Sequence, residues 1–470
     1  MPPVVPVREL SVTEVNQMQH KRNVIMIAGL AIVFVGAFFI SLRDLSPMYT
    51  VGIIFLLGFF LLSFINIRIG FVLIIFAFLL SPEVDLPFSQ YRGFTIRTED
   101  TLIIILMLAW LGRLAMGVQK NLFIKTPLNM PIFAIVVWNI ICSFRAISSG
   151  WVDVNFCIFT NLKIIEFFAI YFLIVNNLND IQEVKFVLYI LLITALVVGV
   201  YAALQIPKTE IFTSNRLTAP FEGKPEPNTL GAYLAIFFGV ALSLFIYTKP
   251  GLLKKLCGIL LLLLPFPIMF SFARSAYYAT LGIVVALAIV SRKKWLIATL
   301  IIFAVLSPFI LPKAVIERTL YNFLVDNRYY GFMDQSLGER FFAFKKAWGY
   351  VKAYPIFGGG ITAAGGVLDS QYARNIIETG LIGLSLFFWL IIRLFKMGIT
   401  LFNESTDWVK GIGVGFLVVV IGLLIHSFGN ITFYIVRIAE PFWALAALVA
   451  YLFLYNQSKQ SNKEISLRQS

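Results

Sequence analysis

Four arginines lie at or near the boundaries of long apolar segments, and together they suggest a site for phosphate groups. Arg216 lies in a polar stretch between two such segments, and Arg274 opens another. Arg340 lies in a long connecting stretch, and Arg437 lies near the start of the last apolar segment. A guanidinium group is planar, stays charged and forms paired hydrogen bonds to phosphate oxygens. The four side chains could therefore bind a diphosphate as one cluster; alternatively, each extends separately to lipid headgroups.

Asp369 is the carboxylate that the sequence offers as a general base. It precedes an apolar segment, and a carboxylate accepts the proton of a hydroxyl to which it is hydrogen-bonded. The alternative role is to cap the helix that follows, because aspartate is favoured at that position. His426, near the end of another apolar segment, is a secondary candidate, although a lone histidine is more often structural.

Ionisable residues inside the apolar segments are functional candidates, because a charge inside a membrane is costly. Lys163 and Glu166 are three residues apart and can face each other on a helix. We interpret them as a pair that neutralises itself, although a transporter would use the same two residues to carry solute. Arg437 and Glu440 repeat this spacing.

The sequence contains no recognisable motif for a metal or a cofactor. Cys142, Cys157 and Cys257 fall in apolar segments, and their spacing matches no metal motif, so we interpret them as small buried apolar residues. There is also no glycine-rich phosphate loop and no Asp-x-Asp pair. We therefore expect no metal and no cofactor, so that catalysis depends on positioning, charge stabilisation and one base.

The elements that position these residues are predicted by hydropathy. The chain is 59% hydrophobic and 13% charged, with a mean hydropathy of +0.88, whereas soluble domains carry about 25% charged residues. Apolar runs near the ~20 residues that cross a bilayer recur throughout. We therefore predict an all-α polytopic membrane protein with about 14 transmembrane helices, placed near residues 24–42, 48–66, 68–81, 101–117, 127–145, 156–176, 185–205, 229–248, 255–271, 274–291, 294–311, 373–396, 411–429 and 433–455.

The distribution of lysine and arginine predicts that both termini are cytoplasmic. With the N-terminus inside, every inside loop is basic, whereas short outside loops such as 147–155 are poor in lysine and arginine. The same rule explains the net charge of +14 without nucleic-acid binding. We expect a multi-pass protein of the cytoplasmic (inner) membrane without a cleaved signal peptide. It comprises a cytoplasmic segment at 1–23, transmembrane helices over 24–311 and 373–455, and a cytoplasmic tail at 456–470.

Two predicted outside loops, 206–228 and 312–372, are longer than a connection needs, and such loops usually carry function. Both loops and Arg274 fall on the same, extracytoplasmic face. Within the larger loop, Ser336 and Glu339 have the spacing of a capping box, which predicts a helix. That helix either lies on a membrane surface, since it is amphipathic and basic, or packs against the bundle. Its apolar stripe consists of Phe341, Phe344, Trp348 and Val351.

Three passages together resemble the O-antigen ligase and polymerase superfamily of bacterial envelope enzymes. Residues 216–231 resemble the family's Arg…Gly…Asn-x-x-Gly passage into a helix, with Asn228 as the asparagine. Residues 270–275 are similar to its Ser-Arg pair opening a helix. Residues 338–383, from Gly-Glu-Arg through Pro-Ile-Phe-Gly-Gly-Gly and Asp-Ser-Gln-Tyr to Glu-Thr-Gly-Leu-Ile-Gly, resemble its large outer loop and the following helix.

The resemblance implies a substrate, a reaction and a site. Members use glycans carried on polyprenyl diphosphate and form glycosidic bonds on the outer face of the membrane without nucleotide sugars, with a GT-C-like helical fold. Membrane lipids and a chain-length regulator are implied as partners. The four arginines would neutralise the diphosphate and Asp369 would be the base. Residues expected to bind the substrate are Asn228, Ser275, Gln371, Tyr372 and His426.

Asp369 favours a polymerase over a ligase. Lipopolysaccharide ligases tend to show His-Asn or His-Ser about eleven residues before the glycine that corresponds to Gly380, where this chain has Asp369. The Asp-x-x-Tyr pattern is more similar to polymerases of O-antigen and exopolysaccharide repeats. The first alternative is a ligase that transfers the glycan en bloc to a lipid or protein acceptor. The second is a secondary transporter or flippase, although the inverted repeats common in transporters are not found in the sequence.

Overall fold

The computed structural model describes residues 47–81, 83–85, 95–117, 123–208, 216–222, 226–310, 313, 315–316, 335–365 and 368–469. Within these ranges the chain is almost entirely helical, and nine of the described helices are long and apolar enough to cross a membrane. The predicted all-α polytopic membrane fold is therefore confirmed. The predicted helix at 24–42 and the predicted cytoplasmic segment at 1–23 lie outside the described residues.

The chain divides into two compact units, one of residues 1–70 and 104–119 and the other of residues 71–103 and 120–470. The described part of the first unit contains α2 (Pro47–Ile65), the start of α3 (Ile67–Leu80) and most of α4 (Thr98–Ala115). A Cβ atom at Gly112 would lie 2.9 Å from the ring of Phe64, so the glycine allows close packing. The guanidinium of Arg113 also donates to the carbonyl of Phe64 at 2.7 Å.

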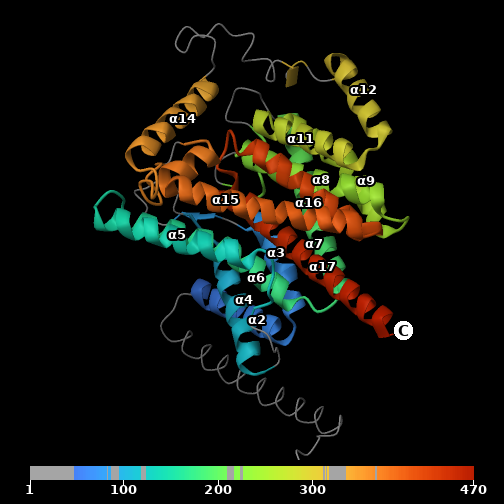
Figure 1. Cartoon of the computed structure of the whole chain (residues 1–470), viewed down its shortest axis with the longest axis horizontal. Coiled ribbons are helices and arrows are strands. Elements are labelled where there is room, and N and C mark those ends of the chain that lie inside the picture. Colours follow the sequence, from blue (N-terminus) through green and yellow to red (C-terminus); the bar gives the residue numbers. More distant parts are fainter. Residues whose placement is uncertain are drawn as a thin grey trace, which may run out of the picture. The chain divides into compact units, whose positions relative to one another are not determined.

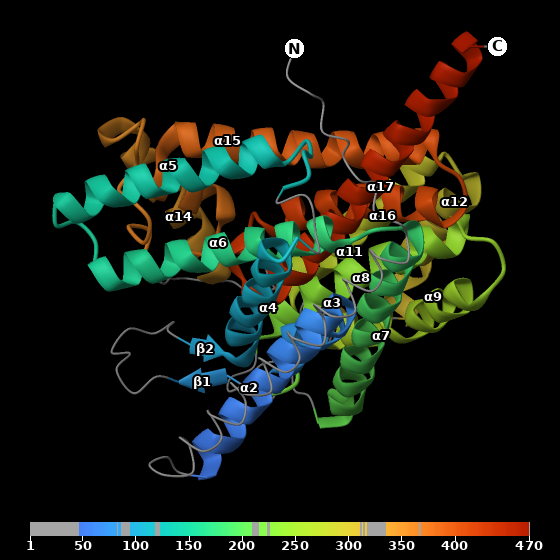
Figure 2. The same cartoon turned by 90° about the horizontal axis from the view of Figure 1, so that it is seen from below.

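The second unit is a helical assembly with one short hairpin, which the hydropathy pattern did not predict (Figures 1 and 2). β1 (Glu83–Asp85) and β2 (Thr95–Arg97) pair antiparallel, with Val84 opposite Ile96. Besides the rest of α3 and the start of α4, the described helices of this unit are α5 (Asn129–Ser148), α6 (Val154–Asn177), α7 (Ile181–Gln205), α8 (Pro227–Tyr247), α9 (Leu252–Leu263), α10 (Pro265–Phe270), α11 (Arg274–Ser291), α12 (Lys294–Ile310), α14 (Gln335–Ala353), α15 (Gln371–Glu404), α16 (Asp407–His426) and α17 (Val436–Gln469), with short 3₁₀ turns η1 (Ile206–Lys208) and η2 (Thr432–Tyr434).

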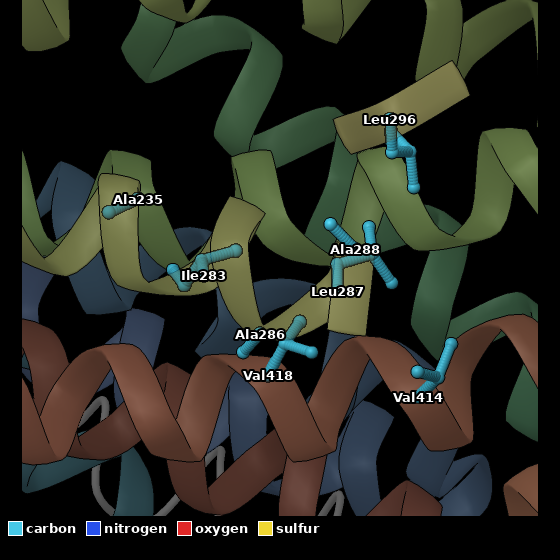
Figure 3. Packing of buried hydrophobic residues seen from close by; sticks show 8 residues of the cluster. All are labelled: Ala235, Ile283, Ala286, Leu287, Ala288, Leu296, Val414 and Val418. Carbon is cyan, nitrogen blue, oxygen red and sulfur yellow. The ribbon is translucent and has the colours of Figure 1, made fainter. Parts of the chain in front are cut away.

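Helices α8, α11 and α16 share one buried apolar cluster, which Figure 3 shows from close by. Ala235 of α8, Ile283 of α11 and Val418 of α16 are each at most 1% exposed. A Cβ atom at Gly239 would lie 2.9 Å from Ile283 and 3.1 Å from Val419. Small residues let helices approach closely where lipid offers no hydrophobic driving force. This packing holds the starts of α8 and α11 beside the end of α16.

Helices α5, α6, α15 and α17 pack in the same unit, with α5 running beside α15 (Figure 2). The indole of Trp443 on α17 packs edge-to-face on Phe168 and Tyr171 of α6, with ring centroids 4.9 and 6.0 Å away. α15 is kinked at Gly380, where φ is +69°. The kink separates the first turns of α15 from its longer second part.

Candidate functional site

The helix predicted from the capping box is present as α14, but its apolar stripe faces away from the protein. Phe341, Phe344 and Trp348 are 64%, 39% and 61% exposed, whereas Ala343 and Ala347 on the opposite side are buried. The two alanines pack with Leu368, Ala364, Ala373 and Ile377, which come from the following loop and from α15. α14 therefore packs against α15, as one of the two interpretations expected, but through small alanines and not through the aromatic stripe.

The loop after α14 is anchored to the kink of α15 through glycines. Because Gly380 has a left-handed φ of +69°, the regular helical hydrogen bonds are interrupted and nearby carbonyls accept other donors. The N–H of Gly359 donates to the carbonyl of Ile377 at 2.7 Å, and that of Gly360 to the carbonyl of Glu378 at 2.9 Å. The kink therefore fixes the position of the loop that leads to Asp369.

A buried ion pair that the sequence analysis did not single out lies beside this anchor. The Nε of Arg374 is 3.0 Å from Oε1 of Glu378, and both residues are buried. Glu378 also accepts a hydrogen bond from the N–H of Thr362 at 3.1 Å. The guanidinium of Arg374 lies over the ring of Tyr434 at 4.7 Å. The sequence feature that could have identified this ion pair is the i,i+4 spacing of Arg374 and Glu378 within an apolar segment. Their contacts assign them to holding the loop and the start of α15 together.

The two residues at the start of α15 are bonded to the end of α16 and to the connection between α16 and α17. The N–H of Gln371 donates to the carbonyls of Ser427 and Asn430 at 3.0 and 3.1 Å, and its side-chain oxygen accepts from the N–H of Phe433 at 3.0 Å. The hydroxyl of Tyr372 donates to the carbonyl of Leu424 at 2.8 Å. Both side chains were predicted to bind substrate, and in the structure both bond to backbone.

Asp369 is exposed just before the N-terminus of α15. The N-cap position belongs to its neighbour Ser370, so the capping role considered for Asp369 is not the one it has. Desolvation by the surrounding protein raises the pKa of the Asp369 carboxyl, and Glu339 raises it further, whereas Arg340 lowers it. A carboxylate that faces solvent with an arginine close by has the environment of an accessible proton acceptor.

Arg340 lies between Asp369 and the turn that follows α16. A Cβ atom at Gly429 would lie 2.6 Å from the guanidinium carbon of Arg340, so the arginine lies close against this turn. His426, one turn earlier, is 0% exposed and its Nδ1 lies 2.9 Å from the hydroxyl of Thr432. The backbone of Asn228 also lies beside its ring. His426 thus connects the α16 end to the α8 start inside the protein.

Arg216 and Arg274 converge on the turn before α11. The guanidinium of Arg216 donates to the carbonyls of Ser271 and Phe272 at 3.0 and 2.8 Å. Arg274 and Ser275 begin α11 directly after this turn, and both are 5% exposed. Two of the four predicted arginines are therefore brought together from segments that are about 60 residues apart in the chain.

Arg437 is paired with a carboxylate inside the protein. Its Nη1 lies 3.2 Å from Oε1 of Glu222, and each side chain is 1% exposed. The same nitrogen donates to the carbonyl of Pro220 at 3.2 Å. Burial raises the pKa of Glu222, and Arg437 opposes this. The i,i+3 spacing of Arg437 and Glu440 was thus misleading, because a loop residue distant in sequence provides the arginine's partner.

Other predicted charges and cysteines can be placed directly. Lys163 pairs with Glu166 at 3.2 Å, as interpreted from the sequence, and also with Asp100. The three cysteines are buried and carry free thiols, which confirms that they are small apolar packing residues.

A small cavity of about 60 Å³ lies between α5, α6, α15 and α17. One end is polar and is lined by Gln371, Asn375 and Tyr434, next to the start of α15. The other end is apolar and follows α15 past Phe387 to Leu394. A ligand with a polar head and a hydrocarbon tail matches this gradient.

Comparison with known proteins identifies one matching family. A family model described as O-antigen ligase matches residues 259–388. The match includes Arg274, Ser275, Arg340, Asp369 and Tyr372 but ends before His426 and Arg437. No curated protein matches the chain significantly. Residues 259–388 of this multi-pass membrane protein are thus similar to the O-antigen ligase family, which supports the resemblance to the O-antigen ligase and polymerase superfamily.

Proposed function

We propose that this protein polymerises oligosaccharide repeat units carried on polyprenyl diphosphate. The observation that carries the proposal is the placement of Asp369 beside Arg340, within a segment that matches the O-antigen ligase family. Arg216 bonds to the turn that directly precedes Arg274 at the start of α11, in the same helical unit. A base and arginines in one unit supply the two functions that glycosyl transfer from a diphosphate requires.

In the proposed reaction, a sugar hydroxyl of one repeat unit attacks the anomeric carbon of a glycan on polyprenyl diphosphate. Its oxygen forms the new glycosidic bond while the bond between the anomeric carbon and the diphosphate oxygen breaks. Asp369 takes the hydroxyl proton, and the polyprenyl diphosphate leaves with the bonding electron pair. Arg216, Arg274 and Arg340 stabilise the negative charge on the leaving group, because charge-assisted hydrogen bonds to phosphate oxygens are strong. We propose no metal and no cofactor in this step.

We assign the remaining predicted residues mainly to positioning. Gln371, Tyr372 and His426 bond within the protein, and Arg437 fixes Glu222 and its loop. Asn228 and Ser275 begin α8 and α11, where backbone N–H groups favour negative charge. These two residues therefore stay proposed contacts of the substrate.

The polyprenyl chain would occupy the cavity between α5, α6, α15 and α17. Its apolar end follows Phe387, Leu390 and Leu394, and its polar end opens toward Asn375 and Tyr434. At about 60 Å³ it holds only a short part of a tail, so the helices must separate to admit more. The exposed aromatic stripe of α14 would lie on the membrane surface, with its lysines toward anionic headgroups.

We place the site on the extracytoplasmic face of the cytoplasmic membrane, with both termini cytoplasmic, because the predicted inside loops are basic. A chain-length regulator is a proposed partner. The second candidate function is a ligase that transfers the glycan en bloc to a lipid or protein acceptor, favoured by the description of the matching family.

The decisive experiment incubates purified protein with a lipid-diphosphate-linked repeat unit, with and without a separate lipid acceptor, and separates the products on a gel. A ladder of lengthening glycans without the acceptor supports the polymerase. Transfer of one block only when the acceptor is present would replace it with the ligase. No product, together with solute uptake by vesicles that contain the protein, would replace both with a transporter.

A further inference from the structure

A second group of charged residues is buried away from the arginine site, where α4, α6 and α17 meet. Four carboxylates gather there, Glu99 and Asp100 from α4, Glu166 from α6 and Glu440 from α17. One ligand oxygen from each of Glu99, Asp100 and Glu440 lies within 4.8 Å of the others. Carboxylates that repel one another at this distance either take up protons or need positive charge between them.

The cations present neutralise only part of this charge. Lys163 pairs with Asp100 and with Glu166, and Nη1 of Arg97 lies 3.8 Å from Glu99. Four carboxylates and two cationic side chains leave two negative charges in excess when all are ionised. A buried excess of charge is unfavourable unless a bound ion or protons compensate it.

Glu440 is the residue that points to a ligand. It is 0% exposed, and neither of its carboxylate oxygens has a hydrogen-bond partner among the described residues. One of these oxygens faces Glu99 and Asp100 within 4.8 Å. By contrast, the buried Glu378 and Glu222 each have a cation and backbone N–H donors. Glu440 is therefore a buried carboxylate aimed into a group of other carboxylates.

We propose that Glu99, Asp100 and Glu440 bind one hard divalent cation, Ca²⁺. Ca²⁺ takes oxygen ligands at about 2.3–2.6 Å, so that opposite ligands stand about 4.6–5.2 Å apart, whereas Mg²⁺ requires about 2.0–2.1 Å. The three oxygens lie within 4.8 Å of one another, so all can reach one ion, and a buried set of carboxylates suits Ca²⁺ better than Mg²⁺, which usually keeps several waters. Its two positive charges balance the two negative charges in excess.

The surroundings supply an entry path for the ion. The side chains of Asp100 and Glu166 keep 12% and 15% exposure, while Glu99 and Glu440 lie deeper at 0%. A cation entering past Asp100 would thus complete its ligand shell with Glu440 last. The ion would join the start of α4 to α17, one turn after Arg437. This site does not depend on the proposed transfer reaction.

The test measures binding of Ca²⁺ itself to the full-length protein in detergent after chelator treatment. Calorimetric titration with CaCl₂ should give one saturable site per chain, and the melting temperature should rise with Ca²⁺ concentration. Glu440→Gln should weaken binding at least tenfold. Glu404→Gln, which alters an exposed carboxylate at the end of α15, should bind Ca²⁺ as the unaltered protein does.

Melting temperatures measured with and without Ca²⁺ distinguish a glutamate that binds Ca²⁺ from one that has only a structural role. Without cation, Glu440→Gln should melt at or above the temperature of the unaltered protein, because it removes one excess negative charge. With saturating Ca²⁺, Glu440→Gln should melt below the temperature at which the unaltered protein melts. If Glu440→Gln does not fold, Glu99→Gln takes its place in the same comparison. The absence of saturable Ca²⁺ binding, with a melting temperature that depends on pH alone, would overturn the proposal in favour of bound protons.

Discussion

Replacing Arg437 with glutamine should destabilise the protein strongly, and replacing Glu222 as well should restore most of the loss. The two groups lie 3.2 Å apart with each side chain 1% exposed, so Arg437→Gln leaves the Glu222 charge buried without a cation. Breaking a buried ion pair on one side costs ~3–5 kcal/mol. In the double variant Glu222→Gln/Arg437→Gln no charge is buried and two amides can hydrogen-bond, so the remaining loss should be about 1 kcal/mol.

Thermal unfolding of the purified protein in detergent measures this difference, which corresponds to several degrees in the melting temperature. Glycosyl transfer by the unaltered protein, Arg437→Gln and the double variant reports on function. A double variant that is as unstable as Arg437→Gln would refute the ion-pair reasoning. A stable double variant with an unchanged kcat but a raised KM for the lipid diphosphate would instead return Arg437 to direct contact with the substrate.

Three further predictions concern the base, the kink and the surface helix. Asp369→Asn should abolish transfer. In the unaltered protein, the acid limb of the pH profile of transfer should lie above the usual aspartate range, because the pKa of Asp369 is raised. The raised pKa stabilises the folded protein at low pH and this stabilisation is lost as the pH rises through it, so Asp369→Asn should not lower the melting temperature at neutral pH. Gly380→Ala should destabilise by about 3 kcal/mol or more, because φ is +69° and the new Cβ would lie 2.2 Å from the carbonyl oxygen of Ile356; a melting temperature equal to that of Gly349→Ala, where a Cβ meets nothing within 4 Å, would contradict this. Trp348→Ser should leave the melting temperature unchanged, because the side chain is 61% exposed. It should also lower the fraction of the protein's tryptophan fluorescence that brominated lipids quench, and an unchanged fraction would place α14 away from the membrane surface.

Local signals predicted the helices well because each depends on neighbouring residues. The apolar run at 229–248 and the capping box at Ser336 both correspond to helices, α8 and α14. The side that α14 turns to the protein could not be predicted, because lipid accepts Phe341 and Trp348 as readily as a protein core does. Small alanines make the contact and give no strong pattern.

The partners of buried charges were the main limit of prediction. The i,i+3 rule gave the pair of Lys163 and Glu166, yet the same rule suggested Glu440 for Arg437, whose partner is Glu222. Spacing along one helix does not include loops that fold back from elsewhere in the chain. The proposed cation site could not be predicted from short motifs either, because Glu99 and Glu440 meet across 341 residues of sequence.

The central claim is that arginines at the start of α11 hold a lipid diphosphate while Asp369 accepts the proton. The most direct measurement is transfer by Arg274→Ala with purified protein and a lipid-diphosphate-linked repeat unit, beside the control Arg393→Ala near the far end of α15. We predict that the ladder of glycans persists in Arg393→Ala and disappears in Arg274→Ala. Folded Arg274→Ala protein should bind the lipid diphosphate more weakly, although its melting temperature falls because the removed side chain is only 5% exposed. A normal ladder from Arg274→Ala would contradict the claim.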